Sequence, residues 1–186
     1  NTTGSNNAAI GNLALLSNTT GNNNAAIGRE ALCGNTTGCD NVAIGLCSMR
    51  YNTTGSNNTA VGKFSGRAID SGSFNTALGY LALGKDQCAI TGGCNVGIGY
   101  GAMQNLTSGN GNIGIGKGTL NANTTGSGNV AIGGGLNANT TGSKNYAVGG
   151  ALQSNTTGTC NVAFGRQALR CNTTGYNNVA IGINVI

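Results

Sequence analysis

The chain has 186 residues, of which 7% are charged and 4% aromatic, and it contains 35 glycines but no histidine, tryptophan or proline. Without histidine it lacks the commonest general base and metal ligand, and its only acidic residues are Glu30, Asp40, Asp70 and Asp86. The net charge of +5 with so few aromatics gives little support to nucleic-acid binding, and no apolar run is long enough for a membrane helix. We therefore expect a protein without catalytic residues, cofactor or metal, rather than an enzyme.

The sequence is one motif repeated eleven times, with the consensus N-T-T-G-x-x-N-x-A-I-G-x-x-A-L-x-x, whose places are called positions 1 to 17 below. The units begin at residues 1, 18, 35, 52, 69, 89, 106, 123, 139, 155 and 172, and residues 86–88 are an insertion. Such a unit is too short for a pair of helices but sufficient for one coil of a β-solenoid. The period predicts a single all-β domain over 1–186, a parallel β-solenoid or β-roll of eleven coils.

Each coil is expected to contain two strands and two corners. The N-T-T-G segment supplies turn-forming asparagine and glycine for the first corner. Positions 7–10, such as "NVAI" and "NTAV", are rich in β-branched residues and predict a strand that ends at a glycine able to adopt positive φ. Positions 13–16, such as "LALL", predict a second short strand.

Two apolar columns are expected to face each other inside the coil, at positions 10 and 15, with position 8 beside them. Position 9, always Ala or Gly, should then point outward, either against a close neighbour or as a neutral surface. Position 10 comprises Ile10, Ile27, Ile44, Val61, Leu78, Ile98, Ile115, Ile132, Val148, Phe164 and Ile181. Position 15 comprises Leu15, Leu32, Met49, Leu83, Met103, Leu120, Leu136, Leu152, Leu169 and Ile186, interrupted by Gly66.

An asparagine stands at position 7 of every unit. A stacked column of amides can bond along its own length and satisfy turn backbone groups, so a structural ladder is favoured over a ligand site. Its members are Asn7, Asn24, Asn41, Asn58, Asn75, Asn95, Asn112, Asn129, Asn145, Asn161 and Asn178. The threonines at positions 2 and 3 are expected to bond local backbone, with an ice-binding face as the alternative.

The N-T-T triplet also matches the N-glycosylation sequon, so exposed corners could carry sugar if the protein is exported from a eukaryotic cell. The candidates are Asn1, Asn18, Asn35, Asn52, Asn57, Asn105, Asn123, Asn139, Asn155 and Asn172.

The seven cysteines allow three local disulfides. Cys33 with Cys39 and Cys88 with Cys94 bracket the same corner in two units, and Cys160 and Cys171 should lie beside that corner, which leaves Cys47 unpaired. Buried or free thiols in a reducing compartment are the alternative. Metal binding has no support, because there is no C-x-x-C pair and no histidine.

Basic residues concentrate at positions 12 and 16, on the edge opposite N-T-T-G. This edge could hold an anionic polysaccharide, but a solvated edge that discourages aggregation is favoured. The residues concerned are Arg29, Lys63, Lys117 and Arg166 at position 12 and Arg50, Arg67 and Arg170 at position 16. The units beginning at 69, 89 and 106 lack N-T-T-G, and a bend, bulge or partner contact is expected there.

The repeat resembles those in the shafts of tail-fibre-like and large surface proteins, and its N-x-A-I-G core resembles the β-roll heads of trimeric autotransporter adhesins, whose period is shorter. The resemblance implies left-handed winding and homotrimers. We expect the structural shaft or subunit of an extracellular fibre, on a cell surface, secreted or on a virion. It would associate with itself as a head-to-tail filament or homotrimer, with glycans as further partners and without nucleic acid or membrane insertion. An adhesin or receptor-binding module and an ice-binding solenoid are the alternatives.

Overall fold

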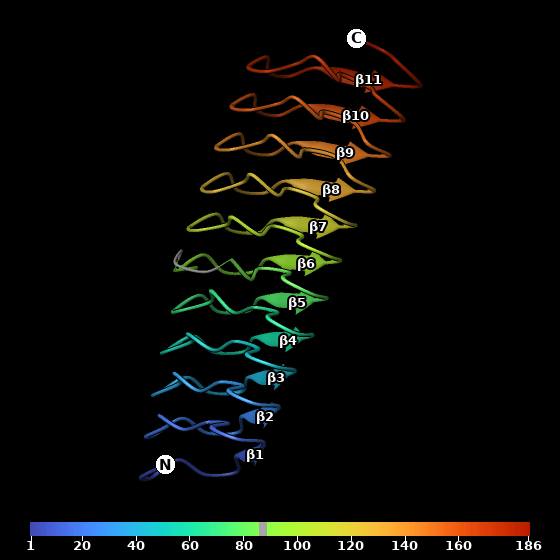
Figure 1. Cartoon of the computed structure of the whole chain (residues 1–186). Coiled ribbons are helices and arrows are strands. Elements are labelled where there is room, and N and C mark those ends of the chain that lie inside the picture. Colours follow the sequence, from blue (N-terminus) through green and yellow to red (C-terminus); the bar gives the residue numbers. More distant parts are fainter. Residues whose placement is uncertain (86–88) are drawn as a thin grey trace.

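The computed structural model describes residues 1–85 and 89–186, which form an all-β solenoid without helices (Figure 1). Eleven strands lie in sequence order in one parallel sheet. They are β1 (Ala8–Ile10), β2 (Ala25–Ile27), β3 (Val42–Ile44), β4 (Thr59–Val61), β5 (Thr76–Leu78), β6 (Val96–Ile98), β7 (Ile113–Ile115), β8 (Val130–Ile132), β9 (Tyr146–Val148), β10 (Val162–Phe164) and β11 (Val179–Ile181). The predicted fold class is therefore confirmed, whereas the left-handed winding stays a prediction.

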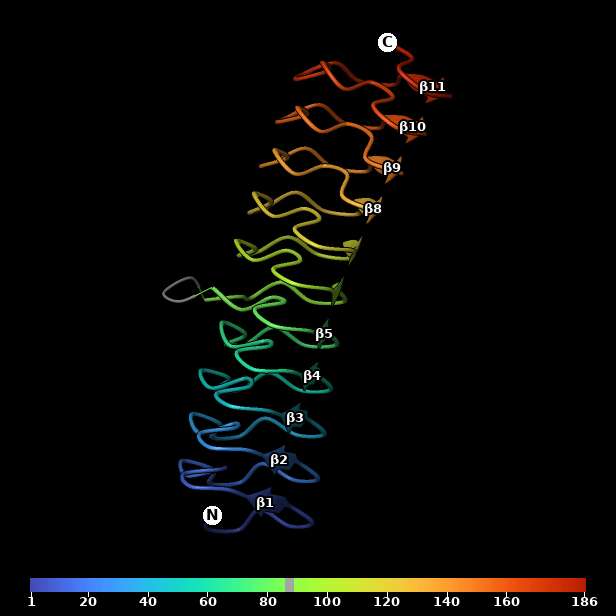
Figure 2. The same cartoon turned by 45° about the vertical axis from the view of Figure 1, so that its right-hand side comes forward.

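The coils stack in register. Ala26 pairs with Ala43 and Ile27 with Ile44, an offset of one repeat, and every neighbouring pair of strands follows the same rule. Figures 1 and 2 show the strands in one column along one side of the stack, with the two termini at its opposite ends. Equivalent side chains therefore form continuous columns along the axis, about 4.8 Å apart.

The second strand that the sequence predicts at positions 13–16 does not form in the described coils, which have turns there. Leu13 and Leu15 have φ of 59° and 53°, and most later coils also have positive φ at these two places. Left-handed residues interrupt the extended backbone that a strand requires. The segment still bonds from coil to coil, because Leu15 N donates to Ala31 O at 3.0 Å and Ser17 N to Cys33 O at 3.0 Å.

The strand faces the opposite way from the expectation. Ala43 at position 9 is fully buried, whereas Ile44 at position 10 is 38% exposed. The prediction that position 10 lines the interior is wrong, as is the prediction that position 9 points outward. The interior is narrow: a Cβ atom added to Gly97 would lie 3.3 Å from Leu83 Cγ and 3.4 Å from Met103 Cε. Position 9 is small because it faces the position 15 column across this narrow space.

The position 15 column is buried, as predicted, apart from Ile186 in the last coil, which is 95% exposed. Gly66 interrupts the column, and its place is covered by Ile69, whose Cδ1 would lie 3.1 Å from a Cβ atom on Gly66. Ile69 stands at position 1, where most coils have asparagine. Ile90 and Leu106 are also fully buried in the next two coils. The middle of the stack therefore has an aliphatic core where the rest has an amide column.

The two repeated glycines have different roles. Gly45, at position 11, has a φ of +128°, which L side chains rarely adopt, so it provides the expected corner. Gly38, at position 4, has no such φ, but a Cβ atom there would collide with the carbonyl oxygen of Gly55 in the next coil. Position 4 must be glycine because the coils approach each other closely at that corner.

Candidate functional site

The position 7 asparagines form a buried hydrogen-bonded ladder. Asn112 Nδ2 donates to Asn95 Oδ1 at 3.1 Å and to Gly126 O at 2.9 Å. Asn112 Oδ1 accepts from the backbone N and from Nδ2 of Asn129, at 3.0 and 3.1 Å. Coil-to-coil bonds of this kind link every step from Asn7 to Asn178. These amides are occupied by each other and by the corner, so they form a scaffold, as predicted, rather than a ligand site.

A second buried ladder, which the sequence analysis missed, runs along position 1. Asn35 Nδ2 donates to Asn18 Oδ1 at 2.7 Å and to Gly38 O at 3.0 Å. The ladder stops at Asn52, whose buried Oδ1 accepts no hydrogen bond because the next coil has Ile69 at that place. The regular recurrence of asparagine at position 1 is the sequence signal for this ladder.

This ladder contradicts most of the glycosylation candidates. A glycan is attached to Nδ2 and needs that atom at the surface. Six candidates are at most 2% exposed: Asn18, Asn35, Asn52, Asn123, Asn139 and Asn155. Their Nδ2 atoms are hydrogen-bonded inside the coil. Asn105 and Asn172 are half-buried and donate from Nδ2 to backbone oxygens, so only Asn1 and Asn57 lie in the exposed class.

The two threonines of the corner differ in environment. At position 2, Thr36 Oγ1 donates to Thr53 O at 3.0 Å, and the same bond recurs along the stack, which confirms the expected backbone bonding. At position 3 the side chain is exposed in every coil, as a threonine or serine. These residues are Thr3, Thr20, Thr37, Thr54, Ser71, Thr91, Ser108, Thr125, Thr141, Thr157 and Thr174. One column of hydroxyl-bearing side chains therefore faces solvent along the whole rod.

Two of the expected disulfides are absent. The free thiols in the described part of the chain are Cys33, Cys39, Cys47, Cys94, Cys160 and Cys171. The cysteines of each expected pair stand at different positions of the repeat, and each is a free thiol. The proposed pairs Cys33–Cys39 and Cys160–Cys171 are therefore wrong, and the pair Cys88–Cys94 includes a residue outside the described ones.

One thiol is buried in an ionic environment. Cys47 is 3% exposed, and its Sγ donates to Glu30 Oε2 at 3.6 Å. Burial, and after it the Glu30 carboxylate, raises the pKa of the Cys47 thiol above its ordinary value. Glu30 also pairs with Arg50 at 3.0 Å and Arg29 at 3.5 Å. In residues 1–85 and 89–186, no three His, Cys, Asp or Glu side chains are grouped to hold a metal.

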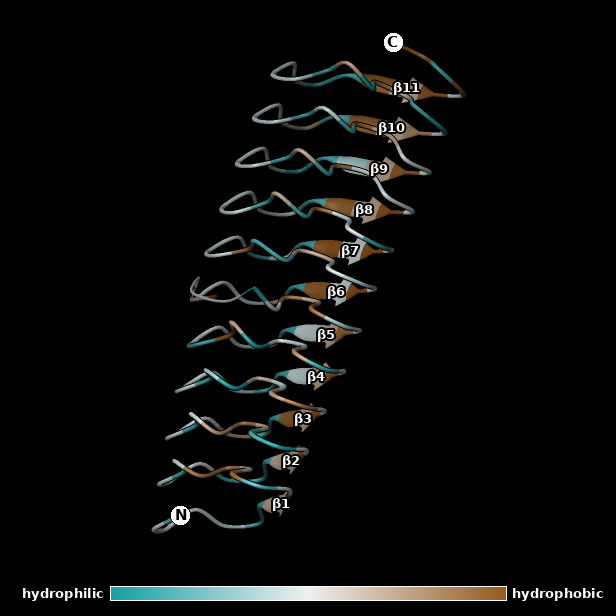
Figure 3. Cartoon of the chain, viewed as in Figure 1, coloured by the Kyte–Doolittle hydropathy of each residue, from teal (hydrophilic) through white to brown (hydrophobic). Residues whose placement is uncertain are grey.

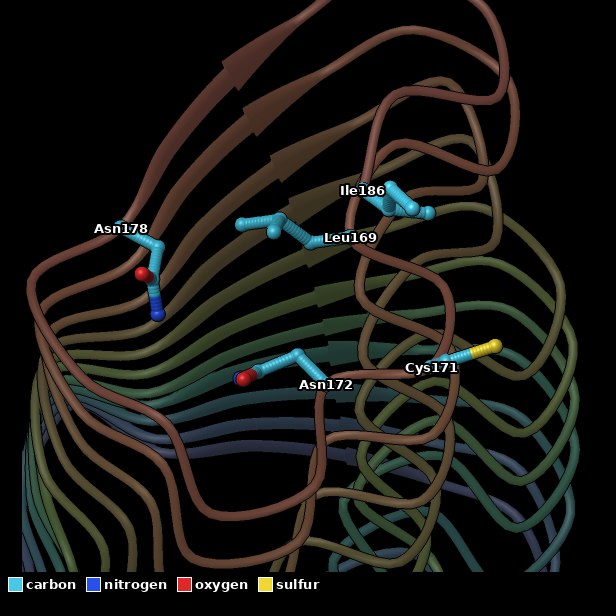
Figure 4. Close-up of a pocket in the computed structure, with 5 residues that line it drawn as sticks. All are labelled: Leu169, Cys171, Asn172, Asn178 and Ile186. Atoms are coloured by element: carbon cyan, nitrogen blue, oxygen red, sulfur yellow. The ribbon is translucent and has the colours of Figure 1, made fainter.

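A cavity of about 250 Å³ lies at the C-terminal end of the stack, lined by Leu169, Cys171, Asn172, Asn178 and Ile186. Figure 4 shows Leu169, Asn172 and Asn178 pointing into the coil, while Cys171 points away from it. Asn172 and Asn178 donate back to Asn155 and Asn161, as their ladders require. The cavity is therefore the interior of the solenoid itself, not a separate ligand pocket.

The outer face of the sheet carries a row of exposed apolar side chains at position 10. We call it the aliphatic outer face: positions 8 and 10 of every coil, which are aliphatic except at Thr59, Thr76, Tyr146 and Phe164. Figure 3 shows apolar colour along most of the strands. Along this face Ile27, Ile44, Ile115 and Ile132 are 37–40% exposed. Sequence analysis placed these side chains inside the coil and therefore missed the surface.

No helix in residues 1–85 and 89–186 has the length and hydropathy needed to cross a membrane. In comparisons with known proteins, no family model, curated protein or solved structure matches this chain.

Proposed function

We propose that this chain is a non-catalytic structural subunit, the shaft of an extracellular fibre. The uniform stacking supports this: the same strand register and the same asparagine bonds join successive coils along the whole chain. Eleven coils at about 4.8 Å each give a rod on the order of 50 Å long. A load along the axis would be shared by backbone and side-chain bonds at every step.

The aliphatic outer face is the observation that carries the proposal furthest. It is about 10 Å wide and 50 Å long, or roughly 500 Å² in projection. That lies in the upper part of the range of about 300–600 Å² for the largest apolar patch of ordinary monomers. We propose that this face is covered by further copies of the chain. Three copies around a common axis are favoured by the resemblance to trimeric adhesin heads, and head-to-tail stacking of such trimers would extend the fibre.

The test measures mass and shape together. Sedimentation equilibrium and negative-stain electron microscopy should find rods with three times the 18.3 kDa mass of one chain. Ile44→Lys with Ile115→Lys places charges on the aliphatic outer face and should yield monomers with an unchanged far-ultraviolet spectrum. Thr54→Lys with Thr125→Lys, on the exposed position 3 column, should leave the trimer intact. A wild-type chain that remains monomeric at about 0.1 mM, well above ordinary nanomolar-to-micromolar affinities, would refute the lateral association.

The exposed position 3 column supports a second candidate, ice binding. Regularly spaced hydroxyl-bearing side chains on a rigid solenoid can order water along a surface. In the part of the chain that the structure describes, position 3 provides this column alone, because the position 2 hydroxyls bond to the backbone. Thermal hysteresis that disappears in Thr54→Tyr with Thr125→Tyr would favour this candidate over the shaft. Normal freezing of concentrated wild-type protein would eliminate it.

A further inference from the structure

Aromatic and basic side chains gather on one edge of the middle coils. We call this the basic–aromatic edge, which consists of Arg50, Tyr51, Lys63, Phe64, Arg67, Tyr80, Tyr100 and Lys117. Its four aromatic residues are half of those in the chain, which has five tyrosines, three phenylalanines and no tryptophan. The edge belongs to the turns at positions 12–17 and is therefore separate from the aliphatic outer face.

The rings form a stack along the solenoid axis. Tyr80 and Tyr100 lie 5.5 Å apart between centroids with an interplanar angle of 21°, and Phe64 follows at 6.0 Å from Tyr80. Lys63 Nζ lies 5.1 Å from the Phe64 centroid and 5.9 Å from that of Tyr80. Lys117 Nζ lies 5.7 Å from the Tyr100 centroid. Tyr80 and Tyr100 are thus stacked face to face, whereas the Phe64 ring is tilted by 53° to that of Tyr80. Tyr80 and Tyr100 remain 39% and 55% exposed.

The arginine side chains of the edge also contact its aromatic rings. Arg67 Cζ lies 4.8 Å from the Phe64 centroid and 5.4 Å from that of Tyr51, and its Nη2 donates to Tyr51 Oη at 3.3 Å. Arg50 Cζ lies 5.5 Å from the Tyr51 centroid, and Arg50 also forms a salt bridge with Glu30. The edge therefore presents a fixed array of positive charges and phenol groups with a net positive charge.

Stacking of the coils does not require this edge. The coils from residue 123 to 154 contain none of its residues, yet they keep the strand register and both asparagine ladders. The aromatic and basic side chains are thus additions to an otherwise sufficient scaffold.

We propose that the basic–aromatic edge binds an acidic polysaccharide laid along the solenoid axis. Ammonium and guanidinium groups would pair with its carboxylates or sulfates, and the tyrosine hydroxyls would bond with its sugar hydroxyls. The coil spacing of about 4.8 Å is close to the length of one sugar residue in an extended chain, so each coil can address one sugar. A single-stranded nucleic acid fits less well, because its bases stack on open ring faces, whereas Tyr80 and Tyr100 stack on each other and Arg67 lies over the Phe64 ring.

Binding is measured by isothermal titration of the wild-type protein with polygalacturonate, alginate and heparin, and with fully methyl-esterified pectin, which has the same backbone as polygalacturonate without its charges. At least one acidic polymer should bind, and the esterified one should not. Affinity should fall several-fold when added salt is raised from about 0.05 to 0.5 M, because exposed charges are screened.

Two variants locate the site. Lys63→Gln with Lys117→Gln should weaken binding about tenfold, as expected for the loss of two exposed ion pairs. Lys144→Gln removes a charge at position 6, away from the columns of positions 12 and 16, and should leave the affinity within about twofold. Tyr80→Phe with Tyr100→Phe keeps the ring stack and should weaken binding without changing the melting temperature.

Three results would overturn the proposal. They are no binding of any acidic polymer, equal weakening in both charge variants, or tighter binding of a single-stranded oligodeoxynucleotide than of every polysaccharide. Because the edge and the aliphatic outer face are separate, the Ile44→Lys, Ile115→Lys variant should still bind the polysaccharide. The failure of one proposal can thus be distinguished from the failure of the other.

Discussion

Asn112→Ala tests whether the buried amide ladder holds the coils together. The side chain is fully buried and takes part in four hydrogen bonds, to Asn95, Gly126 and twice to Asn129. At a net value of about 1 kcal/mol for each bond, the loss is roughly 4 kcal/mol. The backbone N–H of Asn129 also loses its acceptor in a buried place, which adds about 1–2 kcal/mol. The expected loss in the free energy of unfolding is therefore about 5–6 kcal/mol, a large part of the stability of an ordinary domain.

The measurement is urea unfolding followed by far-ultraviolet circular dichroism. With a slope of about 1–3 kcal/mol per molar urea, the midpoint should fall by roughly 2 M or more. Asn110→Ala is the control in the same coil: this side chain makes two hydrogen bonds but is exposed, so water can replace them. The midpoint of Asn110→Ala should correspond to a loss of less than about 1 kcal/mol in the free energy of unfolding. Equal midpoints for the two variants would refute the view that the ladder is a main source of stability.

Three further predictions concern the interior. Ala131→Leu should destabilise the fold by at least about 1–3 kcal/mol, measured by thermal melting, because position 9 faces the narrow core; a neutral result would contradict the observed facing. Gly66→Leu should destabilise the fold by overpacking, and Ile69→Asn should destabilise it by leaving a cavity. The double variant restores the consensus at both positions and should recover stability; additive losses in a double-mutant cycle would contradict this compensation. The raised pKa of Cys47 leaves less thiolate at a given pH, so iodoacetamide should alkylate it at pH 8 much more slowly than Cys160, and comparable rates in peptide mass spectrometry would contradict its burial.

The repeat period and the position 7 asparagine ladder could be predicted from the sequence. A residue that recurs at a fixed spacing forms a column whichever face of the strand it lies on. The facing could have been predicted too. An inward Asn41 implies an inward Ala43 and an outward Ile44, since alternate residues share a face. The general preference of isoleucine for the interior outweighed that rule, although a narrow coil has room only for alanine there.

The turn at positions 12–17 and the basic–aromatic edge were harder to predict. Leucine rarely adopts left-handed φ, so propensity favoured a strand at Leu13 to Leu16, whereas burial and coil-to-coil bonds stabilise the turn. The basic columns were visible in the sequence, but the stack of Tyr80 and Tyr100 depends on how neighbouring coils place their turns. That information is absent from one repeat taken alone.

Identical coils create an ambiguity during folding, because a strand could pair with the next but one coil almost as well as with its neighbour. The aliphatic stretch of Ile69, Ile90 and Leu106 removes this ambiguity, since an asparagine stacked against these side chains leaves amide groups unpaired. Asn52 shows the cost of one such junction. The irregular middle coils thus specify the register in which the coils pair. A variant with uniform consensus coils would be expected to misalign more often.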